Sequence, residues 1–253
     1  FYTFWLNLSN SFMPFFFSLL TLFFFSSLLI FFKFNFFFFF MVIIFFLFFF
    51  KWFFLVFIEA LVGFHSFFSI DGFKFGFLLF LFSEVMFFFS FFWFFFDLVL
   101  VTNMDLGFFS TPLGLEKINP FGLPFFNSLL LLGSASVITF SHYTFLFNGF
   151  SLSSIFFSIF LGFFFILIQI SEYLNSFFTL SDSVFGSLFF LMTGFHGLHV
   201  MLGIIFIFIN FFRQKNKTLN FFHHIGFEFS IIYWHFVDVV WLFLFFFIYW
   251  WVF

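Results

Sequence analysis

The stretch FFFFFMVIIFFLFFF at residues 36–50 carries no polar side chain. A strand of a membrane barrel alternates polar and apolar residues, whereas a buried membrane helix is apolar on every face. The stretch therefore predicts a transmembrane helix. Because about 20 residues are needed to cross the hydrocarbon core of a bilayer, we expect this helix to continue past Lys51 to about residue 58.

The rest of the chain has the same character. Of its 253 residues, 65% are hydrophobic and only 7% are charged. A soluble domain carries about 25% charged residues, because its surface must face water. So few charges cannot cover a chain of this length with a hydrated shell, and the bilayer is therefore the expected solvent.

Polar residues divide the chain into seven apolar segments, each long enough to cross a bilayer as a helix. The segments lie near residues 12–32, 36–58, 75–101, 125–147, 151–174, 184–211 and 228–252. The expected fold is an all-α polytopic membrane protein with seven transmembrane helices. We expect two domains, a two-helix hairpin with its amphipathic connection over residues 1–70 and a five-helix bundle over 71–253.

Composition also excludes several classes of protein. The chain has no cysteine, which excludes disulfides, thiolate metal sites and iron–sulfur ligation. Its net charge of −3 provides no basic field for nucleic acid. The first apolar segment lacks the flanks of a cleaved signal peptide and is expected to be a retained span. Phenylalanine fills 76 positions, and since its codons are rich in A and T, this excess favours an AT-biased genome such as that of an organelle.

Cationic residues of membrane proteins concentrate in the loops of the inner side. With the N-terminus inside, the inner set is Lys51, Lys74, Arg213, Lys215 and Lys217, and the outer set is Lys33 and Lys117. This distribution favours an inner N-terminus and an outer C-terminus. The acidic residues then expected on the outer side are Asp105, Glu116, Glu172 and Asp182.

Several ionisable residues fall within or beside the predicted spans, where a charge costs about 2.5–3.5 kcal/mol. They are Glu84, His196, His199, Glu228, His235 and Asp238. One interpretation is a proton path or a metal site, because two histidines three residues apart share a helix face and carboxylates can complete a ligand set. The other is a network of paired polar groups that joins helices, with Glu84 hydrogen-bonded to the His196/His199 face or to the last span.

Basic residues also gather at one predicted membrane surface, which suits anionic lipid headgroups. The candidates are Arg213, Lys215, Lys217, His223 and His224, with Glu59 and His65 on the same predicted side. The alternative is that these charges only set the topology of the chain.

Small and aromatic residues predict packing and anchoring. Glycines clustered in one span let neighbouring helices approach closely, and they are Gly186, Gly194, Gly197 and Gly203. Aromatic residues near the end of the last span are expected to anchor it at headgroup level, and they are Trp241, Tyr249, Trp250 and Trp251.

From Gln169 to its last residue the sequence closely resembles subunit III of the haem–copper cytochrome c oxidases. The motifs that carry the resemblance are SEY at 171–173, TGFHGLHV at 193–200, HHIGFE at 223–228, YWHFVDVVWLFL at 233–244 and YWW at 249–251. Upstream, SEV at 83–85 followed by FFW at 91–93 resembles the family's third helix, and Asn119-Pro120 resembles its third loop. Before residue 60 only the spacing of Trp52 and Glu59 is similar, and both are therefore further candidates for lipid headgroup contact.

The resemblance implies that helices 1–2 lean away from helices 3–7 and leave a cleft for phospholipid (cardiolipin, phosphatidylethanolamine or phosphatidylglycerol). It implies direct contact with oxidase subunit I, and a complex that includes subunit II and accessory subunits. Haem a, haem a3 and copper would belong to those partners, so this chain would bind no cofactor or metal and carry no catalytic centre. Its expected role is to stabilise subunit I and support proton supply during electron transfer from cytochrome c to oxygen.

The implied location is the mitochondrial inner membrane, with the N-terminus in the matrix and the C-terminus in the intermembrane space. Two alternatives stay open. One is the equivalent subunit of a bacterial cytochrome or quinol oxidase. The other is a proton-coupled transporter, which would be expected to show broken helices and internal repeats.

Overall fold

The computed structural model describes residues 11–30, 35–63, 65, 67–100, 117–148, 151–220 and 224–252. Within these ranges the chain forms seven α-helices, one π-helical turn and no strand. The elements are α1 (Met13–Ile30), α2 (Asn35–Val62), α3 (Phe67–Leu100), α4 (Leu123–Asn148), α5 (Leu152–Leu174), α6 (Val184–Lys215), α7 (Ile225–Leu244) and the π-helical η2 (Phe245–Trp250). The predicted all-α fold is confirmed.

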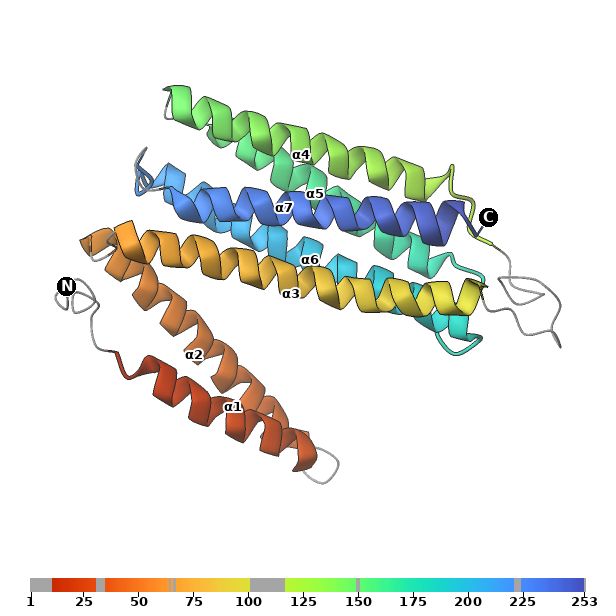
Figure 1. Cartoon of the computed structure of the whole chain (residues 1–253), viewed down its shortest axis with the longest axis horizontal. Coiled ribbons are helices and arrows are strands. Elements are labelled where there is room, and N and C mark those ends of the chain that lie inside the picture. The colour runs from red at the N-terminus through yellow and green to blue at the C-terminus, as the bar shows by residue number, and fades with distance from the viewer. Residues whose placement is uncertain are drawn as a thin grey trace. The chain divides into compact units, whose positions relative to one another are not determined.

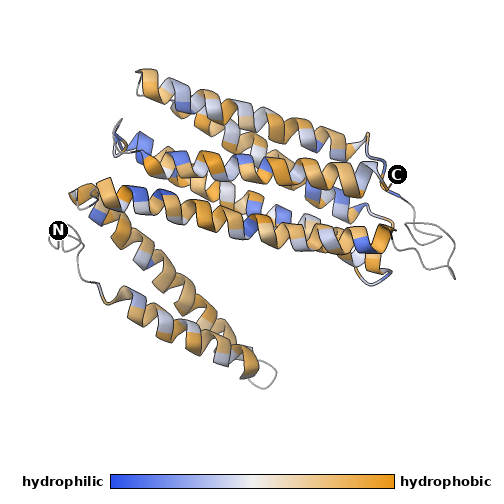
Figure 2. Cartoon of the chain, viewed as in Figure 1, coloured by the Kyte–Doolittle hydropathy of each residue, from blue (hydrophilic) through white to orange (hydrophobic). Residues whose placement is uncertain are grey.

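The lengths of the helices suit a membrane. In the described part of the chain, α2 to α7 are each long and apolar enough to cross a bilayer, while the apolar α1 is shorter. Hydrophobic residues predominate along each of them (Figure 2). Large apolar side chains also point outward, for example Phe75 with 65% and Leu78 with 60% of its surface exposed. Such an exterior is stable against lipid tails and not against water, and the predicted polytopic membrane protein is confirmed.

Three helix ends differ from the prediction by four residues or more. α3 begins at Phe67 rather than at residue 75, α2 continues to Val62 rather than ending at 58, and α6 continues to Lys215 rather than ending at 211. In all three places charged residues interrupt the apolar pattern. Charge ends the hydrophobic span, but Lys and Arg do not end a helix, because they are good helix formers and their charged groups reach the membrane surface.

The chain divides into two compact units, Phe1–Lys74 and Phe75–Phe253, and Figure 1 shows the helices of each. In the first unit α1 packs on α2 through aromatic rings. The ring centroids of Phe24 and Phe45 lie 5.1 Å apart, as do those of Phe17 and Trp52. The predicted domain boundary at residue 70 and the predicted lean of the first two helices stay predictions.

In the second unit Trp234 of α7 is fully buried and contacts three other helices. Its indole Nε1 donates a hydrogen bond to Ser134 Oγ of α4 at 3.0 Å. Its ring also lies directly against Gly162 of α5 and Gly203 of α6, where a Cβ atom would come within 2.8 Å of the ring at either glycine. The missing side chains of these two glycines therefore allow α5, α6 and α7 to pack closely.

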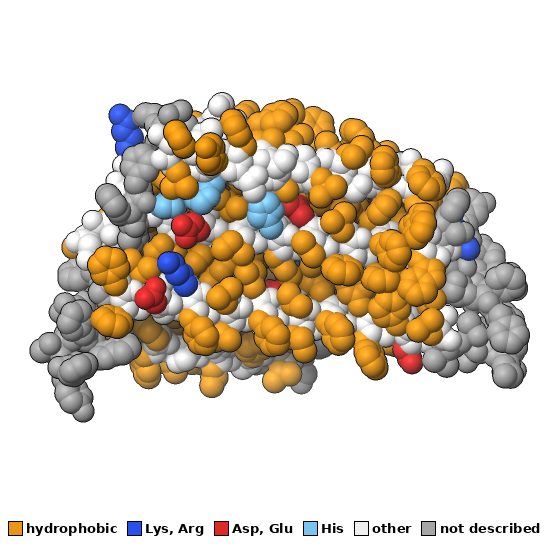
Figure 3. All heavy atoms as spheres, turned by 45° about the horizontal axis from the view of Figure 1, so that its top comes forward, with side chains coloured by type: hydrophobic (Ala, Val, Ile, Leu, Met, Phe, Trp, Pro, Cys, Tyr) orange, Lys and Arg blue, Asp and Glu red, His pale blue; other side chains and the backbone are white. Residues whose placement is uncertain are grey.

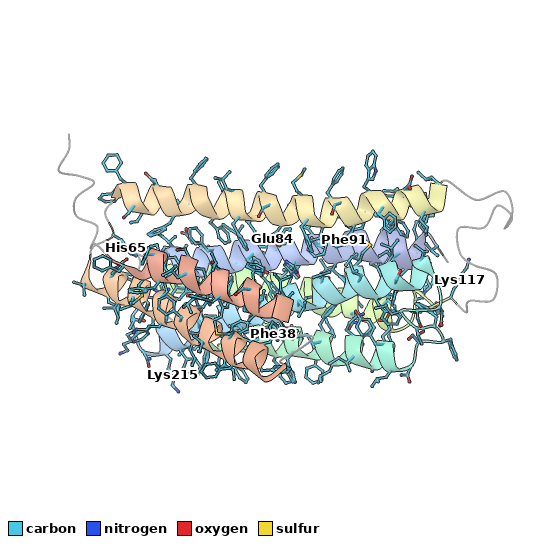
Figure 4. The ribbon with its side chains drawn as sticks, turned by 90° about the horizontal axis from the view of Figure 1, so that it is seen from below. Phe38, His65, Glu84, Phe91, Lys117 and Lys215 are labelled. Carbon is cyan, nitrogen blue, oxygen red and sulfur yellow. The ribbon has the colours of Figure 1, made fainter. Side chains whose placement is uncertain are left out.

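Within the second unit, α3 packs on α6 and α7 through larger side chains. Phe77 stacks on Phe229 with ring centroids 4.4 Å apart, and Phe87 meets Phe195 edge-on at 5.2 Å. The labelled Glu84 and Phe91 lie on the face of α3 turned toward the other helices of this unit (Figure 4). Bulky aromatic contacts hold α3 at a greater distance than glycine holds α5 and α6.

The predicted packing glycines divide into two pairs. A Cβ atom at Gly186 would lie 2.7 Å from the Thr179 carbonyl oxygen, and one at Gly203 would strike Trp234, so close packing is confirmed at these positions. A Cβ atom at Gly194 or Gly197 would meet nothing within 4 Å. The prediction for those two glycines is wrong, because glycine is also common on membrane helix faces that pack against nothing.

The predicted aromatic anchors also divide. Trp250 and Trp251 are 51% and 48% exposed, as anchoring requires. Trp241 and Tyr249 are only 1% and 2% exposed, so the prediction is wrong for them. Their side chains turn into the bundle, where the Trp241 ring meets Phe165 edge-on at 4.8 Å.

We predict that Gly203→Ala destabilises the second unit by about 1–3 kcal/mol, a typical effect of overpacking a core. Trp234 is buried and hydrogen-bonded to Ser134, so its ring has no free space to move into. Gly194→Ala is the matched control in the same helix, because its new methyl group meets nothing. The free energy of unfolding in detergent, followed by circular dichroism, measures both. Equal stability of the two variants would contradict the packing described for Trp234.

Candidate functional site

The most direct contact between predicted site residues joins α3 to α6. The Glu84 Oε2 and His199 Nε2 atoms lie 2.8 Å apart, with 22% and 12% of the two side chains exposed. The rings of Phe88 and Tyr233 lie beside the same histidine, at centroid distances of 5.1 and 6.4 Å. The pair therefore sits largely enclosed by aromatic side chains.

The hydrogen bond of the other His199 ring nitrogen, Nδ1, shows which ring nitrogen carries a proton. Nδ1 lies 2.7 Å from the Phe195 carbonyl oxygen, which can only accept, so Nδ1 carries a proton. One further proton lies between Nε2 and the Glu84 carboxyl group, either as imidazolium with carboxylate or as neutral imidazole with carboxylic acid. Both forms have zero net charge, which lowers the cost of placing them at membrane depth. The pair can exchange a proton internally without changing its total charge.

His196 lies one turn earlier on α6 and faces a different partner. It is 1% exposed, and its Nε2 donates to the Val237 carbonyl oxygen of α7 at 3.2 Å. Its ring lies 5.2 Å from that of Trp241. The structure therefore does not bring the two histidines of the TGFHGLHV motif to a common point, although they are three residues apart.

The remaining predicted pair, His235 and Asp238, is looser. His235 Nδ1 lies 3.8 Å from Asp238 Oδ2, which is too long for a hydrogen bond. Asp238 is buried, with 6% of its side chain exposed, while 39% of the His235 side chain is exposed. No hydrogen bond or ion pair joins either residue to Glu84 among the described residues.

A third group lies where the end of α4 meets the start of α7. His224 Nε2 lies 3.1 Å from Glu228 Oε1, one turn along the chain. The His142 ring of α4 lies 5.6 Å from the His224 ring. In the described residues this is the one group of three potential metal ligands, and one ligand atom from each lies within 4.8 Å of the others. Sequence reasoning had placed His224 and Glu228 in separate sets and had not selected His142.

Glu172 was predicted on the outer side of the membrane, and this orientation stays a prediction. Its burial was not predicted: it lies inside α5 and is only 4% exposed. Its carboxyl group lies beside the Tyr249 hydroxyl, which in turn lies beside the Gln169 amide. Gln169 Oε1 accepts a hydrogen bond from Asn127 Nδ2 of α4 at 3.4 Å. The signal was present in the sequence, because Gly162, Gln169 and Glu172 share the buried face of α5.

The predicted headgroup residues of the second unit lie at the end of α6 and the start of α7. Lys215 and Lys217 are exposed, as headgroup contact requires. Arg213 is partly buried and packs on Gly226, where a Cβ atom would come 2.6 Å from its Nη1. His224 faces Glu228, and His223 lies outside the described residues. Their role in lipid contact stays a prediction.

The first unit holds the other headgroup candidates. Trp52 and Glu59 lie two turns apart on α2, and both line a half-open cavity of about 470 Å³ that is bounded on its other side by the start of α1. Phe12, Met13 and Phe16 supply its apolar wall from that side. His65 packs on Phe73 instead, with ring centroids 5.1 Å apart. The cavity thus combines an acidic group, an indole and an apolar wall.

The histidine, acidic and basic side chains are few on the face shown in Figure 3, where hydrophobic side chains cover most of the surface. Glu84 with His199, and His196 with the Val237 carbonyl oxygen, each form a hydrogen bond between two helices. Such an arrangement can hold helices together, store or pass a proton within a pair, and contact lipid.

Comparison with known proteins points to one family. The sequence profile described as cytochrome c oxidase subunit III matches residues 3–253. Cytochrome c oxidase subunit 3 of Rhipicephalus sanguineus is 42% identical over 191 residues, which are 75% of this chain and 74% of that protein.

Two further relatives carry the same name. The protein of Aedes aegypti is 44% identical over 158 residues, which are 62% of this chain and 60% of the relative. The protein of Mycosarcoma maydis is 47% identical over 159 residues, which are 62% of this chain and 58% of the relative. The aligned part thus spans about three fifths of the length of these two relatives. Because the family profile matches nearly every residue, the chain belongs to the cytochrome c oxidase subunit III family.

Proposed function

We propose that this chain is the non-redox core subunit III of cytochrome c oxidase. The observation that carries the proposal is the family match over residues 3–253. In the proposed complex the chain contacts subunit I directly and shares the assembly with subunit II and accessory subunits. Haem a, haem a3 and copper reside in those partners, where electrons pass from cytochrome c to oxygen.

The exterior of the second unit supports a role as a partner of other membrane helices. The outward face of α3 exposes Phe82, Phe89 and Trp93, at 62%, 54% and 68%. Large apolar side chains of this kind are compatible with lipid tails and with a packed neighbouring subunit alike. We propose that part of this apolar surface covers and stabilises subunit I.

Support for proton supply is the proposed role of the Glu84–His199 pair. The pair holds one exchangeable proton between two side chains on different helices. Ionisable groups inside a membrane bundle are typical of proton relays. Its partial exposure leaves a route by which water or a partner side chain reaches the carboxyl group.

Phospholipid binding is the proposed role of the cavity beside Trp52 and Glu59. A volume of about 470 Å³ with an apolar wall accepts part of an acyl chain. The Trp52 indole is suited to headgroup level, and the Glu59 carboxylate is suited to the ammonium group of phosphatidylethanolamine. At the surface of the second unit, Lys215 and Lys217 are proposed to attract anionic headgroups, as in cardiolipin or phosphatidylglycerol.

The proposed location is the mitochondrial inner membrane, with the N-terminus in the matrix and the C-terminus in the intermembrane space. The distribution of Lys and Arg between alternate connections supports this orientation. Placement in the mitochondrion is supported by the phenylalanine excess of the sequence.

The proposed function predicts that a complex purified gently through this chain carries haem a. A reduced-minus-oxidised optical spectrum should show haem a absorbance, and the preparation should consume oxygen on reduced cytochrome c in a cyanide-sensitive manner. A haem-free preparation of the intact chain with its native partners would refute the assignment to an oxidase.

Variants of Glu84 test the proposed proton role. Glu84→Gln can still donate a hydrogen bond to His199 Nε2, so we expect normal assembly but slower turnover or a shorter lifetime under turnover. Glu84→Ala leaves His199 without this partner, costing about 1–3 kcal/mol, and should lower the yield of assembled complex as well. Asp97→Asn is the matched control, an exposed acid on the same helix. If Glu84→Gln and Asp97→Asn behave alike in all three measurements, Glu84 has no proton role.

The cavity of the first unit predicts a bound lipid. The double variant Trp52→Ala with Glu59→Gln should purify with one phospholipid fewer per chain than the wild type, as counted by native mass spectrometry and phosphorus analysis. Phe53→Ala is the matched control, because this ring lies on the same helix beside Trp52, is 59% exposed and does not line the cavity. An unchanged lipid count in the double variant would rule out lipid binding at this cavity.

A further inference from the structure

The end of the second unit where α4 and α7 meet holds a group of ligand-type side chains that the proposed oxidase role does not use. His142 lies in the last two turns of α4, His224 precedes the first residue of α7, and Glu228 lies in the first turn of α7. One ligand atom from each lies within 4.8 Å of the others. His142 precedes His224 by 82 positions in the sequence, so only the fold brings it beside His224 and Glu228.

The backbone fixes two of these side chains relative to one another. The His224 carbonyl oxygen accepts hydrogen bonds from the backbone N–H groups of Phe227 and Glu228, at 2.8 and 3.2 Å. This turn places Glu228 Oε1 3.1 Å from His224 Nε2. In a tetrahedral zinc site with bonds of about 2.0–2.1 Å, two ligand atoms lie about 3.3 Å apart. The His224–Glu228 pair is therefore already spaced as two ligands of one zinc ion.

The third side chain has a nitrogen available for coordination. His142 Nε2 and His224 Nδ1 are buried, and neither has a hydrogen-bond partner among the described residues. A buried nitrogen without a partner costs about 1–3 kcal/mol. A metal ion bound between the two rings, whose centroids are 5.6 Å apart, would satisfy His142 and use the carboxylate of Glu228 at the same time.

The surroundings suit a bound ion that is reached from one side. The buried rings of Phe145 and Phe227 lie 5.6 Å from His224 and 5.7 Å from His142, respectively. On the other side the Glu228 side chain is 34% exposed, which leaves an entrance for an ion.

The geometry points to a zinc site formed by His142, His224 and Glu228, which joins the end of α4 to the start of α7. Two imidazoles and one carboxylate are a ligand set that zinc prefers, with water in the fourth position. Zn²⁺ would bind in place of any proton held between His224 Nε2 and Glu228 Oε1, and that proton would be released to water. This inference does not depend on the oxidase assignment, because it concerns only side chains of this chain.

The test counts zinc per mole of this chain. The intact complex purified through the chain is treated with EDTA, given an excess of Zn²⁺, passed through gel filtration and analysed by plasma mass spectrometry. The wild type should hold one zinc equivalent more than His142→Gln, His224→Gln or Glu228→Gln, each weakening binding by more than about 10-fold. His235→Gln is the matched control, a half-exposed histidine beside a carboxylate on the same helix but without a third ligand, and should keep the ion.

Two further measurements distinguish the loss of a zinc ligand from the misfolding of a variant. Glu228→Gln keeps the shape of the side chain and its contact with His224, so it reports the loss of a ligand even if a histidine variant fails to assemble. Zn²⁺ should raise the unfolding temperature of the wild type and leave that of Glu228→Gln unchanged. The zinc absorption edge of the additional equivalent should show nitrogen and oxygen ligands at about 2.0–2.2 Å. Equal zinc content in wild type and variants, or sulfur ligands on the additional equivalent, would overturn the inference, because this chain has no cysteine.

Discussion

The packing of Trp234 against three neighbouring helices sets the arrangement of the second unit. Its ring fills the space left by Gly162 and Gly203, and its Nε1 is held by Ser134. The side chain thus fixes how far α7 can slide or rotate relative to α5 and α6. Tightly packed cores do not deform continuously. The packing of Trp234 therefore also determines where the other side chains of α7 lie.

The positions of the polar groups follow from that register. Val237, one turn after Trp234, offers its carbonyl oxygen to His196 at 3.2 Å. The Tyr233 ring lies 6.4 Å from His199, which reaches across to Glu84. A shift of α7 by one residue would separate these groups and leave buried donors and acceptors without partners, at a cost that a bilayer cannot offset with water. Apolar packing and polar pairing are therefore mutually dependent in this bundle.

Much of this fold can be predicted from the sequence alone, because each transmembrane helix corresponds to a long run of apolar residues. The stretch at residues 36–50 allows no other structure in a bilayer, and the described helices lie close to the predicted segments. The predicted helix ends were wrong where polar residues end the hydrophobic span but do not end the helix. Asp71, Gly72 and Lys74 interrupt the apolar pattern but continue α3, since polarity at the membrane surface does not break a helix.

The site was harder to predict than the fold, because the type of a residue does not show whether its side chain points into the bundle or away from it. Glu172 and Asp182 are both acidic residues near the same connection, yet Glu172 is buried and Asp182 accepts a hydrogen bond from the backbone of an exposed turn. Gly194 and Gly203 lie in one span, yet only Gly203 meets a neighbouring ring. Periodicity along α5 identifies the buried face in retrospect, whereas the partner of each side chain depends on the packing of whole helices.

The same reasoning explains why different histidines of this chain suit different chemistry. At membrane depth His196 is hydrogen-bonded to the Val237 carbonyl oxygen, and His199 to the Phe195 carbonyl oxygen and the Glu84 carboxyl group. Coordination of an ion through the same nitrogens would break those bonds. His196 Nδ1 and His142 Nε2 are both buried without a partner among the described residues, but of the two only His142 lies in a group of three potential ligands. Ligand chemistry is therefore favoured where the helices end, since there an ion can enter without first dismantling the pairs that hold the membrane core together.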